Sequence, residues 1–169
     1  MNPSTSVISK ALARELQTVL EHECTQLSLV MEAQSLERGR QPDSWSRREE
    51  LGHLIDSAVN NHWRFVRASL EGALTGPGYD QEGWVRAHGY HDLPWPDLIS
   101  LWRQHNAILV HLIGRVPDAR LAAMCRIGDG QPVTLRFLIA DYILHMQHHL
   151  DHILRRETIT AYPGAALGG

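Results

Sequence analysis

Apolar side chains recur at steps of three and four residues along four long stretches of this chain. Only an α-helix brings residues with that spacing onto one face, so the pattern predicts four amphipathic helices. We place them at residues 6–37, 46–72, 94–114 and 134–156. Ser46 and Glu49 have the spacing of a capping box, and Thr134 is a candidate N-cap for the last helix. Together, these segments predict an all-α fold, a four-helix bundle.

The segments between the helices are marked by glycine and proline. Residues 73–93 interleave these residues with aromatic side chains, so we expect a turn-rich connection with short helical pieces that can cover a site. The length of 169 residues and the 43% hydrophobic content suit one domain over residues 1–160. Residues 161–169, rich in Gly and Ala, are expected to form a flexible C-terminal tail.

Composition and charge indicate which partners and which cellular location to expect. The net charge is −3 and no block of basic residues is present, so nucleic acid is not an expected partner. The N-terminus lacks the pattern of a signal peptide, and no run of eighteen apolar residues occurs, so we expect a cytoplasmic protein without membrane contact. Cys24 and Cys125 are too few for a disulfide framework, and we interpret them as reduced thiols.

Four of the eleven histidines lie within residues 141–152, inside the last predicted helix. Histidines four residues apart project side by side from a helix and can bind one metal ion. Two pairs fit, His145/His149 and His148/His152. At about 100° per residue, the first pair lies about 90° from the centre of the apolar arc and the second about 150° away. We therefore choose His145 and His149, and expect His148 and His152 on a solvated face.

A further ligand should come from a facing helix, as is typical of metal sites in bundles. The first three predicted helices carry candidates: His22, His53, His62, His105 and His111. His53 stands out because it shares a polar stripe with Asp56, Asn60 and Arg64, opposite an apolar stripe. The alternative interpretation of that stripe is a solvated face. It forms a site only if it lines an open end of the bundle.

Several segments together resemble the DinB-like superfamily. They are residues 45–54 (WSRREELGHL), Tyr79-Asp80 and Trp84, the Pro-Trp-Pro-Asp of residues 94–97, and Thr134-Leu135 leading to residues 145–150 (HMQHHL). The resemblance implies an up-down-down-up four-helix bundle, a homodimer, and a divalent metal held by one histidine of the second helix and a pair on the fourth. In this sequence those positions are His53, His145 and His149. Zinc or nickel are the expected ions, with iron or manganese as alternatives.

Three imidazoles leave at least one coordination position open, which is typical of catalytic rather than structural zinc sites. The nucleophile would be metal-bound water or thiolate, so no side chain is assigned a catalytic role. Asp141 and Asp56 are candidates to orient the ligands, and Arg64 and Arg67 are candidates to bind the carboxylate of a thiol cosubstrate. All four have an alternative interpretation as surface residues. Trp84 is a candidate wall of the pocket.

The leading hypothesis is a metal-dependent transferase that adds a low-molecular-weight thiol to an electrophilic small molecule. The DinB-like resemblance implies this thiol chemistry, and it also leaves open a metal-dependent hydrolase or a non-catalytic, dimeric binding protein. Met146 follows His145, so the His-Glu-x-x-His arrangement of zinc proteases is absent and peptide hydrolysis of that type is disfavoured.

Overall fold

The computed structural model describes residues 6–39 and 44–163. Its four long helices are α1 (Val7–Ser28), α3 (Arg47–Glu71), α5 (Trp95–Arg115) and α6 (Leu135–Ile153). The shorter elements are α2 (Glu32–Ser35), β1 (Ala73–Gly76), α4 (Gln81–His88), η1 (Tyr90–Asp92), η2 (Asp118–Ala122), β2 (Met124–Ile127) and β3 (Val133–Thr134). Among the described helices, none is long and apolar enough to cross a membrane. The tail predicted from residue 161 lies mostly outside the described ranges.

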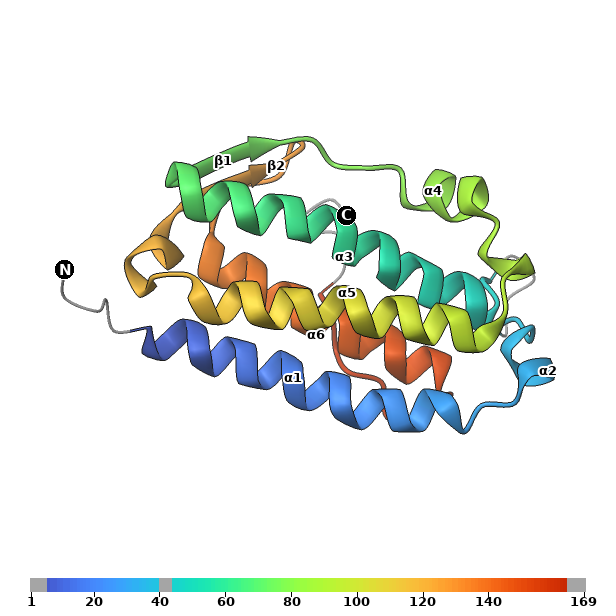
Figure 1. The fold of residues 1–169 in the computed structure, drawn as a ribbon. Helices are drawn as coiled ribbons and strands as arrows, with labels where there is room; N and C mark the ends of the chain where they lie inside the picture. The colour runs from blue at the N-terminus through green and yellow to red at the C-terminus, as the bar shows by residue number, and fades with distance from the viewer. Residues whose placement is uncertain (1–5, 40–43, 164–169) are drawn as a thin grey trace.

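The four long helices pack side by side as the predicted bundle (Figure 1). In Figure 1, α1 and α6 run in one direction, whereas α3 and α5 run in the other. This order confirms the up-down-down-up topology. The helices α3 and α5 are parallel because the chain between them returns along the length of the bundle through β1, α4 and η1. The short helical pieces expected within residues 73–93 are α4 and η1.

Local signals fix both ends of α3 and the start of α6. The Ser46 hydroxyl accepts from the Glu49 amide at 3.3 Å, and the Glu49 carboxylate accepts from the Ser46 amide at 2.7 Å, which is the predicted capping box. Thr134 caps α6 through its hydroxyl alone, which accepts from the Phe137 amide at 3.2 Å. At the other end of α3, Gly72 adopts a φ of 78°, a left-handed conformation that favours glycine.

The prediction of one helix over residues 6–37 is wrong beyond Ser28. The helix α1 ends there, and the chain turns through an extended Met31 into the four-residue α2. Tertiary contacts explain the break. The indole Nε1 of Trp95 donates to the Leu27 carbonyl at 3.0 Å, and the Glu32 carboxylate accepts from the Trp95 amide. A continuous helix would carry Glu32 away from these partners.

A small three-stranded sheet lies alongside the C-terminal half of α3 (Figure 1) and was not predicted. Its order is β1-β2-β3, with β1 and β2 parallel and β2 and β3 antiparallel. Leu74 in β1 pairs with Cys125 in β2, and both side chains are buried. Cys24 is half-buried, and both cysteines are free thiols, as expected.

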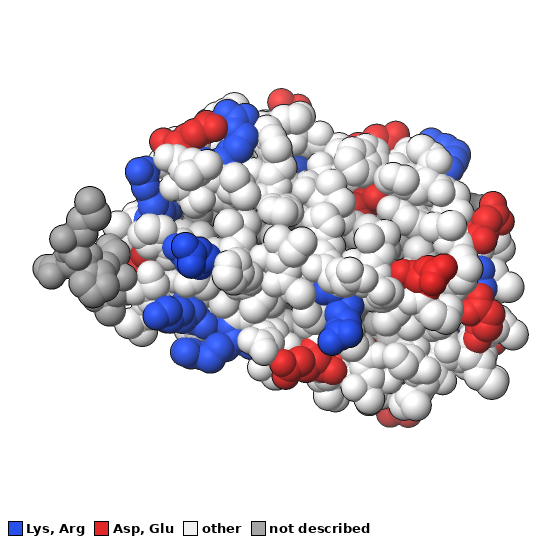
Figure 2. Space-filling view, in the orientation of Figure 1, with Lys and Arg blue, Asp and Glu red and all other residues white. Residues whose placement is uncertain are grey.

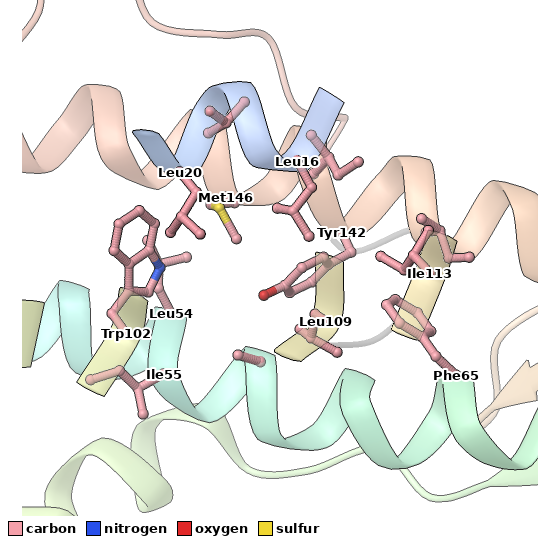
Figure 3. Close-up of a cluster of buried hydrophobic side chains, with 14 of the residues drawn as sticks. Leu16, Leu20, Leu54, Ile55, Phe65, Trp102, Leu109, Ile113, Tyr142 and Met146 are labelled. Carbon is pink, nitrogen blue, oxygen red and sulfur yellow. The ribbon is translucent and has the colours of Figure 1, made fainter. Parts of the chain in front are cut away.

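The hydrophobic core runs along the bundle axis, where all four long helices contribute side chains (Figure 3). The labelled residues of this core are Leu16, Leu20, Leu54, Ile55, Phe65, Trp102, Leu109, Ile113, Tyr142 and Met146. Tyr142 is the polar exception, and its hydroxyl donates to Asn106 Oδ1 at 2.6 Å. A buried hydroxyl with a partner avoids the cost of an unsatisfied group.

Candidate metal centre

The structure brings His53, His145 and His149 together. One nitrogen from each ring can be chosen so that all three lie within 4.8 Å of one another. The Nε2 atoms of His53 and His145 are 3.1 Å apart, and the ring centroids of His53 and His149 are 4.7 Å apart. Among the described residues, this is the one group of three or more His, Cys, Asp or Glu side chains with such geometry.

Two helices position these rings. His53 lies on α3 and is fully buried, whereas His145 and His149 project one turn apart from α6 at the border of the core. The sequence-based choice between the two histidine pairs therefore selected the pair that faces α3. His148 and His152 lie further out, where the His148 Nδ1 atom is 2.8 Å from the Thr160 carbonyl.

Burial keeps all three imidazoles uncharged. Burial, together with the neighbouring His149 and His145, lowers the pKa of His53 to about 2. Burial lowers the pKa of His145 to about 3, helped by His149 and His148, and that of His149 to about 3, helped by His148 and His152. A neutral imidazole is the form that donates a lone pair to a metal ion. The triad is therefore in its ligating protonation state at neutral pH.

Glu50 contacts the triad from the preceding turn of α3. Its Oε1 atom lies 3.0 Å from Nδ1 of His149. When Glu50 is ionised its carboxylate can only accept, and this contact then places the His149 proton on Nδ1 and leaves a lone pair on Nε2. Burial raises the pKa of the Glu50 carboxyl to about 7, and the nearby His152 and His148 partly offset that effect.

Aromatic rings complete the surroundings of the triad. Trp45 packs against His53 with ring centroids 5.0 Å apart, and Tyr162 packs against His145 at 5.2 Å. These contacts matter most for His53, because its buried Nδ1 atom has no hydrogen-bond partner among the described residues. Packing, rather than a hydrogen bond at that atom, holds the ring in place.

The donor set fits a divalent transition metal. Two nitrogens bound to one tetrahedral zinc at about 2.0–2.1 Å are roughly 3.3 Å apart, close to the 3.1 Å between the Nε2 atoms of His53 and His145. Three neutral nitrogen donors suit zinc, nickel, copper or iron, and they suit calcium or magnesium poorly because those ions prefer oxygen. The residues present are thus compatible with the metal expected from the sequence.

A cleft of about 760 Å³ borders the triad at His149. Its walls include Arg38, Trp45, Glu50, His148, His149, His152, Arg155 and Arg156. The arginines are held by acidic partners, since Arg156 pairs with Glu23 and Asp151, both at 2.7 Å. The cleft gives a small molecule space beside the second pair of histidines and His149.

Other residues singled out in the sequence make different contacts. Asp56 accepts from the Tyr90 hydroxyl at 2.6 Å, and Asp141 accepts from the Tyr162 hydroxyl at 3.2 Å. Arg64 donates to the Pro77 carbonyl at 3.3 Å, and Arg67 forms an ion pair with Glu71 at 2.7 Å. Trp84 packs against Tyr79 and His88, within the segment that covers α3. The candidate roles in orienting ligands and binding a carboxylate therefore have no support in these contacts.

Sequence reasoning missed Glu50, Trp45 and Tyr162. A signal for Glu50 was present, because it precedes His53 by three residues and so lies on a neighbouring part of the same helix face. Tyr162 had no such signal. It follows α6 in a segment without regular structure, and its contact with His145 depends on how that segment folds back.

Three comparisons place the chain among known proteins. A protein of Halalkalibacterium halodurans, provisionally named a metal-dependent hydrolase, is 24% identical over 136 residues, which are 80% of this chain and 79% of that protein. YfiT from Bacillus subtilis, described as a probable metal-dependent hydrolase with an unusual four-helix bundle topology, superposes with a TM-score of 0.75. Its identity is 20%, and the match covers 87% of this chain and 84% of YfiT.

A mycothiol-dependent maleylpyruvate isomerase superposes with a TM-score of 0.71 at 14% identity, over 90% of this chain and 63% of the isomerase. At such identities the structural likenesses establish the fold, while the family comes from the sequence. The model of the DinB superfamily matches residues 12–153, a range that holds all four long helices but for the first turn of α1, and the whole histidine triad. The chain belongs to the DinB superfamily.

Proposed function

We propose that this chain is a divalent-metal-dependent transferase that joins a low-molecular-weight thiol to an electrophilic small molecule. The observation that carries the proposal is the meeting of three uncharged imidazoles from α3 and α6, of which His53 is buried and the other two are half-buried. Zinc or nickel come first as the ion, with iron or manganese as alternatives. A divalent ion held by three protein ligands supplies Lewis-acid chemistry that lowers the pKa of a thiol or of water.

The chain's own residues prepare the centre for a substrate. Glu50 orients His149 through its Nδ1 atom, and the rings of Trp45 and Tyr162 pack against His53 and His145. The cleft beside His149 has the volume of a pocket for a small molecule. The structural neighbour that uses mycothiol supports a thiol as cosubstrate, because it shares this fold.

Metal-dependent hydrolysis is the second candidate. It is favoured by the names of the relatives, which describe metal-dependent hydrolases. The same donor set serves both reactions, since water and a thiol compete for one kind of position. A third candidate is a bundle that binds metal without turnover. Experiment distinguishes it from the transferase and the hydrolase.

The first test measures metal content and turnover together. The purified protein is analysed for bound metal by mass spectrometry, then assayed with a panel of low-molecular-weight thiols and a chromogenic electrophile. We expect about one ion per chain and thiol-dependent turnover. In the His149→Ala variant, bound metal and turnover should each fall at least about tenfold, because two imidazoles alone bind a divalent ion weakly. The His111→Ala variant is the control and should retain metal and turnover, because His111 is exposed on α5 and lies outside the cleft.

The possible outcomes distinguish the candidates. Turnover of activated esters or amides with metal but without a thiol would assign the hydrolase. Stoichiometric metal without turnover of either substrate class would leave a binding protein. Metal retained at wild-type occupancy in His149→Ala would contradict the triad itself.

A further inference from the structure

The chain reverses its direction directly after α6. Arg155 adopts a φ of 53°, and within the described ranges it is the one residue other than glycine with a positive φ. This left-handed conformation turns the chain back at the end of the helix, although it is unfavourable for a side chain other than glycine. Residues 157–163 then run back along α6 toward the middle of the bundle (Figure 1). We call residues 157–163 the strap.

Three side chains of α6 hold the strap. The Thr160 amide and hydroxyl both donate to Oδ2 of Asp151, at 2.7 and 2.6 Å. The Nδ1 atom of His148 donates to the Thr160 carbonyl at 2.8 Å, because a carbonyl oxygen only accepts. The Tyr162 hydroxyl donates to Oδ2 of Asp141 at 3.2 Å. Thr160 takes part in most of these hydrogen bonds and is therefore the main anchor.

The strap covers the α6 side of the metal centre. The ring of Tyr162 packs against His145 with centroids 5.2 Å apart, and against His148 at 5.9 Å. Ile159 lines the cleft that borders the triad at His149. The strap therefore lies beside both α6 ligands of the triad.

The bundle itself covers α6 from the other side. In Figure 1, α5 lies in front of α6 with α1 and α3 beside it, and the space-filling view of that side shows a continuous surface (Figure 2). Asp141 and His148, which hold the strap, lie on the face of α6 turned away from its apolar arc. On that face the strap, and not the packed core, covers the triad.

The strap is held less firmly than the turn from which it starts. Arg156 fixes the turn, because it pairs with Glu23 of α1 and Asp151 of α6, both at 2.7 Å. The strap has no regular structure, and none of its side chains is fully buried. Segments with few buried apolar contacts open locally while the rest of a protein stays folded.

We propose that the strap is a lid on the metal centre. It opens and closes about the turn at Arg155 while the bundle stays folded, and an ion enters or leaves the triad through the open state. This inference rests on the metal centre of the proposed function, but not on the reaction that the centre performs.

Hydrogen exchange of the metal-free chain tests the opening alone. The Thr160 amide should exchange at least about a hundredfold faster than the amides of Met146 and Leu150, which lie in the core part of α6. Low concentrations of urea should leave the Thr160 rate unchanged, because a small local opening exposes little surface. A Thr160 amide that exchanges only with global unfolding would overturn the proposal.

Metal kinetics test the closing. Thr160→Val keeps the shape but removes a hydrogen bond to a carboxylate, so it should populate the open state at least about tenfold more. A lid limits entry and exit alike, so zinc uptake and chelator-driven release should accelerate together, and the dissociation constant should stay within about threefold of the wild type. Thr158→Val, at an exposed threonine of the same strap, is the matched control and should change neither rate.

Variants of Tyr162 remove the cover itself. Tyr162→Ala should accelerate uptake and release at least as much as Thr160→Val, and Tyr162→Phe, which keeps the ring, should have a smaller effect. Faster release with unchanged uptake would overturn the lid, because the strap would then stabilise the bound ion instead of limiting access. Unchanged rates in a chain that binds zinc would also overturn the lid alone. A wild-type chain that binds no divalent metal would overturn the proposed function together with this role of the strap.

Discussion

Glu50 lies 3.0 Å from Nδ1 of His149, and in its ionised form the carboxylate holds the proton of that ring on Nδ1. In Glu50→Gln the shape is kept, but an amide presents a donor and an acceptor, so the preference for one tautomer weakens. We expect the affinity for zinc or nickel to fall about 10- to 100-fold, as is usual when a partner of a ligating histidine is changed. Competition with a chelating dye measures this affinity.

A tautomer measurement separates positioning from a general loss of structure. Above the raised pKa of Glu50, where its carboxyl is ionised, nitrogen NMR of the imidazoles should show His149 protonated at Nδ1 in the wild type and a mixture of tautomers in Glu50→Gln. Glu157→Gln is the control, because Glu157 lines the same cleft but is exposed. Unchanged metal affinity and an unchanged tautomer in Glu50→Gln would show that Glu50 has no positioning role.

At the level of single residues, the sequence predicted which histidines converge. The angle of a side chain around its own helix follows from 3.6 residues per turn, so His145 and His149 could be separated from the outer pair. The contact between His149 and Glu50 depends instead on how α6 is rotated and shifted against α3. The spacing of Glu50 and His53 indicates that both lie on one side of α3, but the local pattern of neither helix determines which histidine of α6 contacts Glu50.

At the level of elements, the N-terminus of α1 is capped by a residue that lies far away in the sequence. Asp118 in η2 accepts hydrogen bonds from the backbone amides of Val7, Ile8 and Ser9, at 2.8, 3.0 and 3.0 Å. These are amides that the helix itself leaves without partners. The Ser9 amide, together with those of Ile8 and Val7, holds the pKa of the Asp118 carboxyl below its ordinary value.

The sign of this shift predicts a pH dependence. Because the folded pKa is lower than the unfolded value of about 3.9, the contact stabilises the protein fully above that pH and is lost as the pH falls through the folded pKa. Asp118→Ala should therefore lower the urea midpoint at pH 7, and the difference from wild type should shrink between pH 4 and pH 3. Hydrogen exchange at Val7–Ser9 should also accelerate at pH 7. Asp129→Ala, at an exposed turn, is the control, and an equal loss at every pH would contradict the prediction.

The elements also show where prediction from sequence stops. The starts of α3 and α6 were predicted, because Ser46 and Thr134 carry local capping chemistry. The end of α1 was not, because the Trp95 indole that binds the Leu27 carbonyl lies 68 residues away. The sheet was missed for a related reason. Strands of four and two residues are too short to show an alternating pattern, and β1 pairs with a strand about fifty residues later.

At the scale of the whole molecule, burying the triad between α3 and α6 lowers the stability of the metal-free bundle. Three imidazoles are removed from water there, and one of their buried nitrogens has no hydrogen-bond partner among the described residues. A buried polar group without full satisfaction destabilises a fold by about 1–3 kcal/mol. A metal ion that binds the folded state, and not the unfolded chain, would stabilise the fold and offset this loss of stability. Metal binding and stability of the bundle should therefore be linked.

Removing the metal measures how much metal binding stabilises the bundle. At a free metal concentration of about 1,000 times the dissociation constant, binding stabilises the fold by about 4 kcal/mol, which for a chain of this length raises Tm by roughly 8–16 °C. Calorimetry of the chelated and the reloaded protein should show this difference. The His148→Ala variant should keep this difference in Tm between the chelated and the reloaded protein. The His53→Ala variant should lose the difference, whatever its own Tm without metal, because it lacks the α3 ligand of the triad while both α6 histidines remain. Equal Tm values with and without metal in the wild type would mean that no ion bridges the two helices.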